Sequence, residues 1–134
     1  MGGLSRAKGK RGERELAALL SDLTGRSIKR RVRQHEGDSD LEGLPGWAIE
    51  CKRYARVTPS LLGTWWKQAH AQAKRTGDAP LLCWRSDRMK DWRFHWPAGL
   101  HCHDAPLCPE SISDTLGADP LTWWRMVKGL KGTS

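Results

Sequence analysis

The protein has 134 residues, 38% of them hydrophobic, and a formal net charge of +8. This length is enough for one domain with a buried core and too short for two. No run approaches the roughly 18 apolar residues of a membrane helix, and no apolar stretch follows the basic N-terminus as it would in a signal peptide, so we expect a single cytoplasmic domain.

The positive charge is concentrated near the N-terminus. Residues 1–33 carry ten Lys or Arg against three acids, whereas residues 36–42 carry four acids and no base. A basic surface beside an acidic pocket suits a metal-dependent enzyme that acts on nucleic acid, because cations bind phosphates and carboxylates bind the metal. The alternative is a solvated basic tail. The candidate DNA contacts are Lys8, Lys10, Arg11, Arg14, Lys29, Arg30, Arg31, Arg33 and Arg53.

The first predicted elements are a flexible basic arm, a helix and a strand. The arm is residues 1–10, which are rich in Gly, Lys and Arg. The helix begins near Arg11 or Gly12 and stops at Gly25, because leucines recur at helical spacing in between. Ile28 to His35 alternates loosely and is predicted to be a strand.

Glu13 lies on or beside the apolar face of this first helix. A carboxylate on the buried side needs a partner. One interpretation is a favourably placed acid in the first helical turn. The other is that Glu13 reaches a site formed by residues further along the chain.

The stretch from Gly37 to Tyr54 is the candidate site. It contains an acidic loop with Asp40 and then a predicted strand, Trp47 to Tyr54, in which Glu50 and Lys52 point to the same face. Two converging carboxylates repel each other unless a cation lies between them, and oxygen ligands suit Mg²⁺ or Mn²⁺. A lysine beside the metal can hold a water or neutralise charge on a phosphate. The alternative is an ordinary solvated face.

A second helix is predicted from Leu61 to Arg75 and is closed by Gly77. Gln68 and Gln72 fall on one stripe of it, and each is either a site residue or a boundary between core and solvent. Two strands in a hairpin follow, Pro80 to Arg85 and Trp92 to Trp96.

The remainder, residues 97–118, is expected to be irregular, and a last helix is predicted from Leu121 to Leu130 after Asp119-Pro120. His101, Cys102, His103 and Cys108 suggest zinc, but their spacing fits no common structural zinc motif. We expect all four cysteines of the chain to be reduced.

This order of residues resembles the PD-(D/E)XK nuclease superfamily. The matching residues are Glu13 on a first helix, Ser39-Asp40 in the loop, Glu50-Cys51-Lys52 on the strand and a glutamine on the next helix. Within the superfamily the chain is most similar to Holliday junction resolvases of the archaeal type and their small phage relatives, through the pattern from Lys8 to Leu16. The resemblance covers about residues 8–96. Ser39 stands where the name-giving proline would be.

The resemblance implies an α/β fold with a mixed central sheet flanked by helices. It makes Asp40 and Glu50 metal ligands together with the Cys51 carbonyl, and Lys52 the residue that positions or activates water. Glu13 would complete the site directly or through water, supported by Gln68 (or Gln72). The implied protein is a Mg²⁺- or Mn²⁺-dependent endonuclease that cuts four-way DNA junctions as a homodimer, in a bacterial or phage-infected cell.

Three other functions stay open on the sequence. One is a nuclease of the same superfamily that cuts flaps or DNA ends. Another is a DNA-binding protein with a degenerate site, against which the intact acids and lysine argue. The last is a zinc-stabilised binding module built on residues 95–108.

Overall fold

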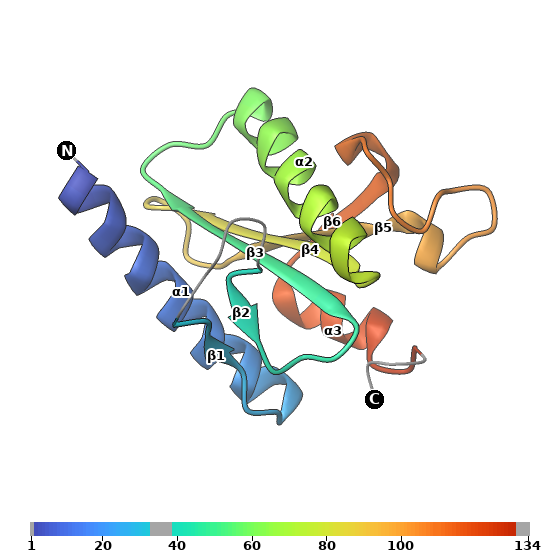
Figure 1. Cartoon of the computed structure of the whole chain (residues 1–134), viewed down its shortest axis with the longest axis horizontal. Helices are drawn as coiled ribbons and strands as arrows, with labels where there is room; N and C mark the ends of the chain where they lie inside the picture. The colour runs from blue at the N-terminus through green and yellow to red at the C-terminus, as the bar shows by residue number, and fades with distance from the viewer. Residues whose placement is uncertain (1, 33–38, 131–134) are drawn as a thin grey trace.

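The computed structural model describes residues 2–32 and 39–130, with side chains from Gly9 onward. It contains one six-stranded mixed sheet and three α-helices (Figure 1). The helices are α1 (Gly2–Thr24), α2 (Pro59–Thr76) and α3 (Pro120–Val127), and two 3₁₀ turns span Ala98–Leu100 and Ile112–Asp114. The strands are β1 (Lys29–Arg30), β2 (Leu41–Glu42), β3 (Trp47–Tyr54), β4 (Ala79–Ser86), β5 (Arg93–Pro97) and β6 (Thr115–Ala118).

The strands lie in the order of the sequence, from β1 to β6. Only β3 and β4 run parallel, joined by α2 as a crossover helix, and the other neighbours are antiparallel. A parallel pair needs such a long connection, whereas the antiparallel pairs are joined by shorter loops. The predicted α/β fold, with a mixed sheet flanked by helices, is confirmed.

The two faces of the sheet carry separate cores. Leucines of α1 and Trp123 of α3 pack on one face with Ile49 and Cys83. On the other face, α2 places Trp65 and Trp66 against Leu82. Six of the eight tryptophans are buried, which agrees with the expectation that most of them form the core of a chain with one Phe and one Tyr.

The middle elements match the prediction closely. β3 has the predicted bounds, and α2 begins at a cap in which the Thr58 side chain accepts a hydrogen bond from Leu61 N. Gly77 ends α2 with φ +79°, in the left-handed region that favours glycine. β4 and β5 form the predicted antiparallel pair.

The N-terminal prediction was wrong in one respect. Residues 2–10 are the first turns of α1 and not a flexible arm. This stretch contains Ala, Leu, Lys and Arg, which are good helix formers, and adding turns to an existing helix is favourable once it has nucleated.

Two short strands were not predicted. β2 lies inside the acidic loop, and β6 lies in the stretch expected to be irregular, where it completes the sheet beside β5. The predicted strand from Ile28 to His35 is limited to Lys29–Arg30 among the described residues, and residues 33–35 lie outside them. Short strands of polar and small residues give little hydrophobic alternation to detect.

Candidate active site

The centre of the candidate site is the edge of β3 that faces β2. Asp40 lies immediately before β2, and its Oδ2 accepts a hydrogen bond of 2.7 Å from the backbone N–H of Cys51. The N–H and C=O of one residue in a strand point to the same side, so the Cys51 carbonyl also points toward the Asp40 edge. Asp40 N in turn donates to Ile49 O at 2.9 Å, which fixes the loop against β3.

Glu50 and Lys52 lie on the face of β3 that α2 covers. Glu50 is in register with Leu82, which belongs to the core under α2. Lys52 Nζ is 3.2 Å from Glu50 Oε1, and the glutamate is 4% exposed. The other carboxylate oxygen, Oε2, is buried and has no hydrogen-bond partner among the described residues. A buried carboxylate oxygen without a partner is costly, so this atom is suited to a cation.

Glu13 reaches the neighbourhood of the site from α1. Its Oε2 accepts a hydrogen bond of 2.8 Å from Arg30 Nε, and both side chains are largely buried. The charge of Glu13 also contributes to the raised pKa of Asp40. Arg30 is therefore a partner of the candidate site.

The carboxylates of the site repel each other. Burial, with the charges of Glu50 and then Glu13, raises the pKa of Asp40 to about 8, against the opposing effects of the Cys51 N–H and Lys52. Desolvation and like charge both favour the neutral carboxyl. A divalent cation among these oxygens would remove both penalties.

A pH dependence of stability follows from this shift. Folded Asp40 keeps its proton between pH 4 and 8, where the unfolded chain has lost it, so metal-free protein should become less stable as pH rises through that window. Asp40→Asn removes this titration and should have a higher Tm than the wild type at pH 8, with a smaller difference at pH 5. Mg²⁺ should raise the wild-type Tm most at pH 8. Parallel Tm curves for the two proteins would contradict the shift.

Close packing of α1 on β3 holds Glu13 in place. A Cβ on Gly12 would lie 2.8 Å from the Cβ of Arg53, whereas a Cβ on Gly9 would meet nothing within 4 Å. Gly12→Ala should therefore destabilise the protein by about 1–3 kcal/mol through overpacking. Gly9→Ala should instead be stabilising by about 0.5–1 kcal/mol, as expected within a helix. Chemical unfolding of both variants is the measurement, and equal effects would contradict the close contact.

A comparison with protein families identifies the chain. Residues 4–98 match the family described as "Phage putative PDDEXK endonuclease", which is more than half of the sequence. The chain belongs to this family. The matched region includes α1, the acidic loop, β3, α2 and β4, and therefore all the elements that form the candidate site.

A comparison with solved structures finds a similar fold. One match is the 1.6 Å structure of Archaeoglobus fulgidus Hjc, described as a Holliday junction resolvase from an archaeal hyperthermophile. The two chains are 17% identical, the match covers 84% of each, and the TM-score is 0.47. No curated protein matches the sequence.

The two candidate glutamines of this PDDEXK endonuclease differ in their surroundings. Gln68 is exposed on α2. Gln72 is half-buried on the same helix, and its Oε1 is buried without a hydrogen-bond partner in the part of the chain that the structure describes. Of the two, only Gln72 has a polar atom enclosed between α2 and the rest of the protein.

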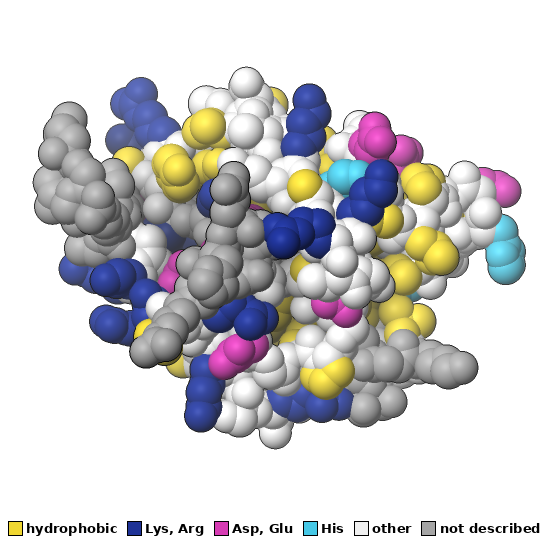
Figure 2. Space-filling model, in the orientation of Figure 1, with side chains coloured by type: hydrophobic (Ala, Val, Ile, Leu, Met, Phe, Trp, Pro, Cys, Tyr) yellow, Lys and Arg dark blue, Asp and Glu magenta, His cyan; other side chains and the backbone are white. Residues whose placement is uncertain are grey.

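Among the described residues, the candidate DNA contacts are of two kinds, exposed cations and cations paired with an acid. Lys10, Arg11, Arg14 and Lys29 are exposed, and Lys and Arg side chains gather on the side of the molecule where α1 lies (Figure 2). Arg30 is paired with Glu13, Arg31 is 3.3 Å from Glu42, and Arg53 is 2.6 Å from Asp87. The Lys8 side chain and Arg33 lie outside the described residues.

The histidines and cysteines after β5 have separate contacts. Trp96 Nε1 donates to His101 Nε2 at 2.9 Å, and Cys108 Sγ is 3.4 Å from His70 Nδ1. Cys102 Sγ donates to the Ala98 carbonyl. Within residues 9–32 and 39–130, no three or more His, Cys, Asp or Glu side chains are grouped so as to hold a metal ion. The described histidines and cysteines after β5 therefore give the zinc hypothesis no support. The site carboxylates each have their own contact, Glu13 with Arg30, Glu50 with Lys52 and Asp40 with Cys51 N.

Some relevant residues were not found from the sequence. Arg30 was expected to contact phosphate, and its ion pair with Glu13 was missed because the two residues are 17 positions apart in the sequence, on different elements. Arg56, Trp84 and Arg88, which line a hollow described below, were also missed. The sequence feature that could have indicated them is their position just after or at the ends of β3 and β4, since the carboxyl ends of parallel strands form binding sites.

No helix of the described chain is long and apolar enough to cross a membrane.

Proposed function

We propose that this protein is a divalent-metal-dependent, structure-selective endonuclease that cuts four-way DNA junctions by paired phosphodiester hydrolysis. The observation that carries the metal dependence is the buried, unpartnered Oε2 of Glu50 beside Asp40, a carboxyl with a raised pKa. These oxygens are suited to a cation, and Lys52 Nζ lies 3.2 Å from the other carboxylate oxygen of Glu50, Oε1. Membership in the PDDEXK endonuclease family supports the reaction.

The residues present fit Mg²⁺ or Mn²⁺. The donors would be carboxylate oxygens of Asp40 and Glu50 with the Cys51 carbonyl, all oxygen ligands of the kind that hard divalent cations prefer. Glu13 would take part directly or through water. When bound, the ion would supply positive charge to the phosphate and lower the pKa of a bound water.

The remaining roles belong to side chains around this set. Lys52 would hold the attacking water or neutralise the charge that develops on the phosphate as a P–O bond forms and the opposite P–O bond breaks. Arg30 would orient Glu13. Gln72, rather than the exposed Gln68, would support the site from α2, because its Oε1 is enclosed.

The preference for branched DNA rests on the pattern from Lys8 to Leu16, which resembles that of junction resolvases. A four-way junction presents two symmetric phosphates, so a homodimer with two-fold symmetry would cut both. The exposed cations of α1 would hold the DNA. Such an enzyme would act in the cytoplasm of a bacterial or phage-infected cell.

Loss of two α1 cations should weaken DNA binding in a salt-dependent way. Arg11 and Arg14 are exposed and have no ion pair within the described part of the chain. Arg11→Gln with Arg14→Gln should reduce the slope of log K against log salt by about 2, since each phosphate contact contributes about 0.9. The matched control is Arg125→Gln on α3 with Lys128→Gln at its C-cap. Fluorescence anisotropy at several salt concentrations measures both, and equal slopes would place the DNA elsewhere.

The substrate preference is tested with a labelled DNA panel in Mg²⁺. A four-way junction, a flap, a single strand and plain duplex are compared. Paired, symmetric nicks in the junction alone are expected. Cutting of flaps or ends instead would indicate another nuclease activity of the same superfamily. Tight junction binding without cutting of any substrate would indicate a DNA-binding protein.

A further inference from the structure

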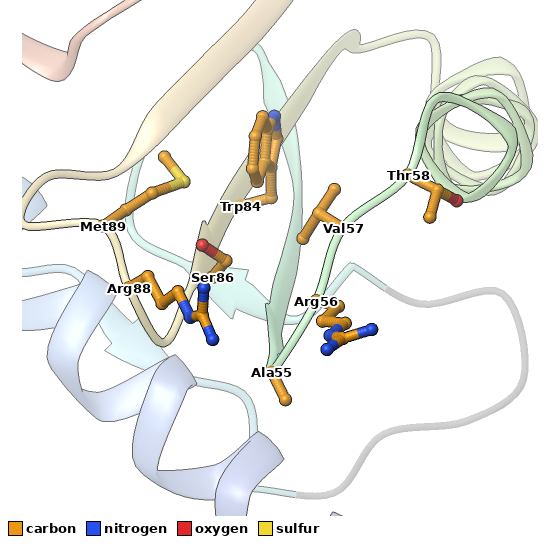
Figure 3. Close-up of a pocket in the computed structure, with 8 residues that line it drawn as sticks. All are labelled: Ala55, Arg56, Val57, Thr58, Trp84, Ser86, Arg88 and Met89. Atoms are coloured by element: carbon orange, nitrogen blue, oxygen red, sulfur yellow. The ribbon is translucent and has the colours of Figure 1, made fainter.

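A hollow of about 390 Å³ opens at the carboxyl ends of the two parallel strands, β3 and β4. Its walls come from two segments, the connection from β3 to α2 and the end of β4 with the turn that follows it (Figure 3). In sheets with parallel strands, ligands bind outside these carboxyl ends. The hollow therefore has the position of a binding site, and none of the metal or water chemistry proposed above uses it.

An aromatic ring lies at the centre of the hollow. The Trp84 side chain is half-buried, and Figure 3 shows it between Val57 and Met89. The indole lies nearly parallel to the ring of His95, with an interplanar angle of 14° and centroids 6.4 Å apart. His95 is itself packed closely, because a Cβ on Gly117 would lie 3.0 Å from its Cε1. A flat aromatic surface held in one orientation suits a planar ligand such as a nucleobase.

Two free cations accompany this aromatic surface. Arg56 and Arg88 are exposed and come from the two opposite walls. Within residues 9–32 and 39–130 neither has an ion pair or a hydrogen bond, whereas Arg53 on β3 and Arg85 on β4 are both paired with acids. Guanidinium groups bind phosphate well. A ligand that combines a flat ring with a phosphate fits both features.

The hollow adjoins the candidate active site. Trp84 is in register with Lys52 on the neighbouring strand, and both lie on the face that α2 covers. Adjacent strands are about 4.8 Å apart. A nucleotide in the hollow would therefore lie beside the phosphate that Lys52 contacts.

We propose that this hollow holds one unpaired nucleobase of the DNA substrate beside the cut phosphate, with the base against Trp84 and a flanking phosphate on Arg56 and Arg88. The inference rests on the proposed action on DNA. It also gives a physical source of structure selectivity. A base in plain duplex must be unpaired and unstacked before it can enter, whereas a base at a branch point or gap is more readily displaced.

The first test detects the contact itself without cleavage. Duplex DNA with a short single-stranded gap carries one 5-iododeoxyuridine in the gap, and it is irradiated with the wild-type protein in EDTA. Mass spectrometry of the crosslinked peptides should identify Trp84 or Met89. The same label inside paired duplex should not crosslink there. Crosslinks confined to other parts of the protein would overturn the proposal.

The second test measures coupling between the base and the ring. In EDTA, replacing the gap nucleotide by an abasic one should lower wild-type affinity about tenfold. The same replacement should have little further effect on Trp84→Ala, because the contact is already lost, and Trp84→Phe should behave more like the wild type. If the abasic replacement lowered the affinity of Trp84→Ala by the same factor as that of the wild type, the proposal would be overturned.

If Trp84→Ala fails to fold, a variant that lacks the two arginines of the hollow tests the proposal instead. Arg56→Gln with Arg88→Gln should weaken binding of gapped DNA more than binding of plain duplex, whereas Arg125→Gln on α3 should not discriminate between them. Equal weakening of both DNAs would overturn the proposal.

Failure of the nucleobase site can be distinguished from failure of the proposed function. A Trp84 crosslink without cleavage of any DNA in Mg²⁺ contradicts only the proposed function, and junction cleavage without that crosslink contradicts only the nucleobase site.

Discussion

Asp40→Asn should reduce DNA cleavage by about a thousandfold or more, the scale on which loss of one charge-stabilising group slows an enzyme. The amide keeps an oxygen that accepts the hydrogen bond from Cys51 N, so the loop should stay in place. It loses the negative charge that a divalent ion requires. DNA binding in EDTA should be nearly unchanged, because the phosphate-binding cations lie elsewhere. Initial rates on the preferred DNA measure the effect.

Glu42→Gln is the matched control for this substitution. Glu42 lies two residues further along, is exposed, and pairs with Arg31 on the surface. It should retain nearly full cleavage. Stability adds a second criterion, since Asp40→Asn should be the more stable protein at pH 8 even though it is inactive. An Asp40→Asn variant that cut DNA at the wild-type rate would exclude Asp40 as a metal ligand.

Lys52→Met should have the second large effect, on both activity and stability. The methionine keeps much of the aliphatic length but removes the ammonium 3.2 Å from Glu50 Oε1. Cleavage should fall by about a hundredfold to a thousandfold, since the water or the phosphate loses its positive partner. The folded protein should also lose about 3 kcal/mol, because the buried Glu50 is left without its partner.

Lys67→Met on α2 controls for the removal of a lysine. Lys67 is exposed and makes no ion pair within the described ranges, so its loss should change neither cleavage nor stability appreciably. Single-turnover cleavage and urea unfolding, measured on both variants, separate the two effects. If Lys52→Met were fully active at saturating Mg²⁺, Lys52 would be only the structural partner of Glu50.

The local sequence pattern was sufficient to predict the secondary-structure elements that position the candidate site. The alternation in Trp47–Tyr54 predicted β3 and the common face of Glu50 and Lys52, and the turn residue Gly77 predicted the end of α2. These features depend on side-chain period and backbone conformation, which the sequence contains directly. The extent of the first helix was underestimated, because glycine and basic residues were interpreted as flexible.

Features that depend on tertiary contacts could not be predicted in the same way. Pairing of Arg30 with Glu13 requires knowing how α1 meets β1, and helical spacing alone left Gln68 and Gln72 equivalent until the packing of α2 enclosed one of them. The hollow at Trp84 forms only when two parallel strands end at the same edge. Burial, which raises the pKa of Asp40, is likewise a property of the folded chain.

We expect Asp40, Glu50 and Lys52 to form a metal-dependent centre for phosphodiester hydrolysis. The most direct measurement is cleavage of end-labelled DNA by wild type and Glu50→Gln, each in Mg²⁺, in Mn²⁺ and in EDTA, with folding of both proteins verified by their Tm. Wild type should give products with either metal and none in EDTA, and Glu50→Gln should give none under any condition. Equal cleavage in EDTA, or by folded Glu50→Gln, would contradict this expectation.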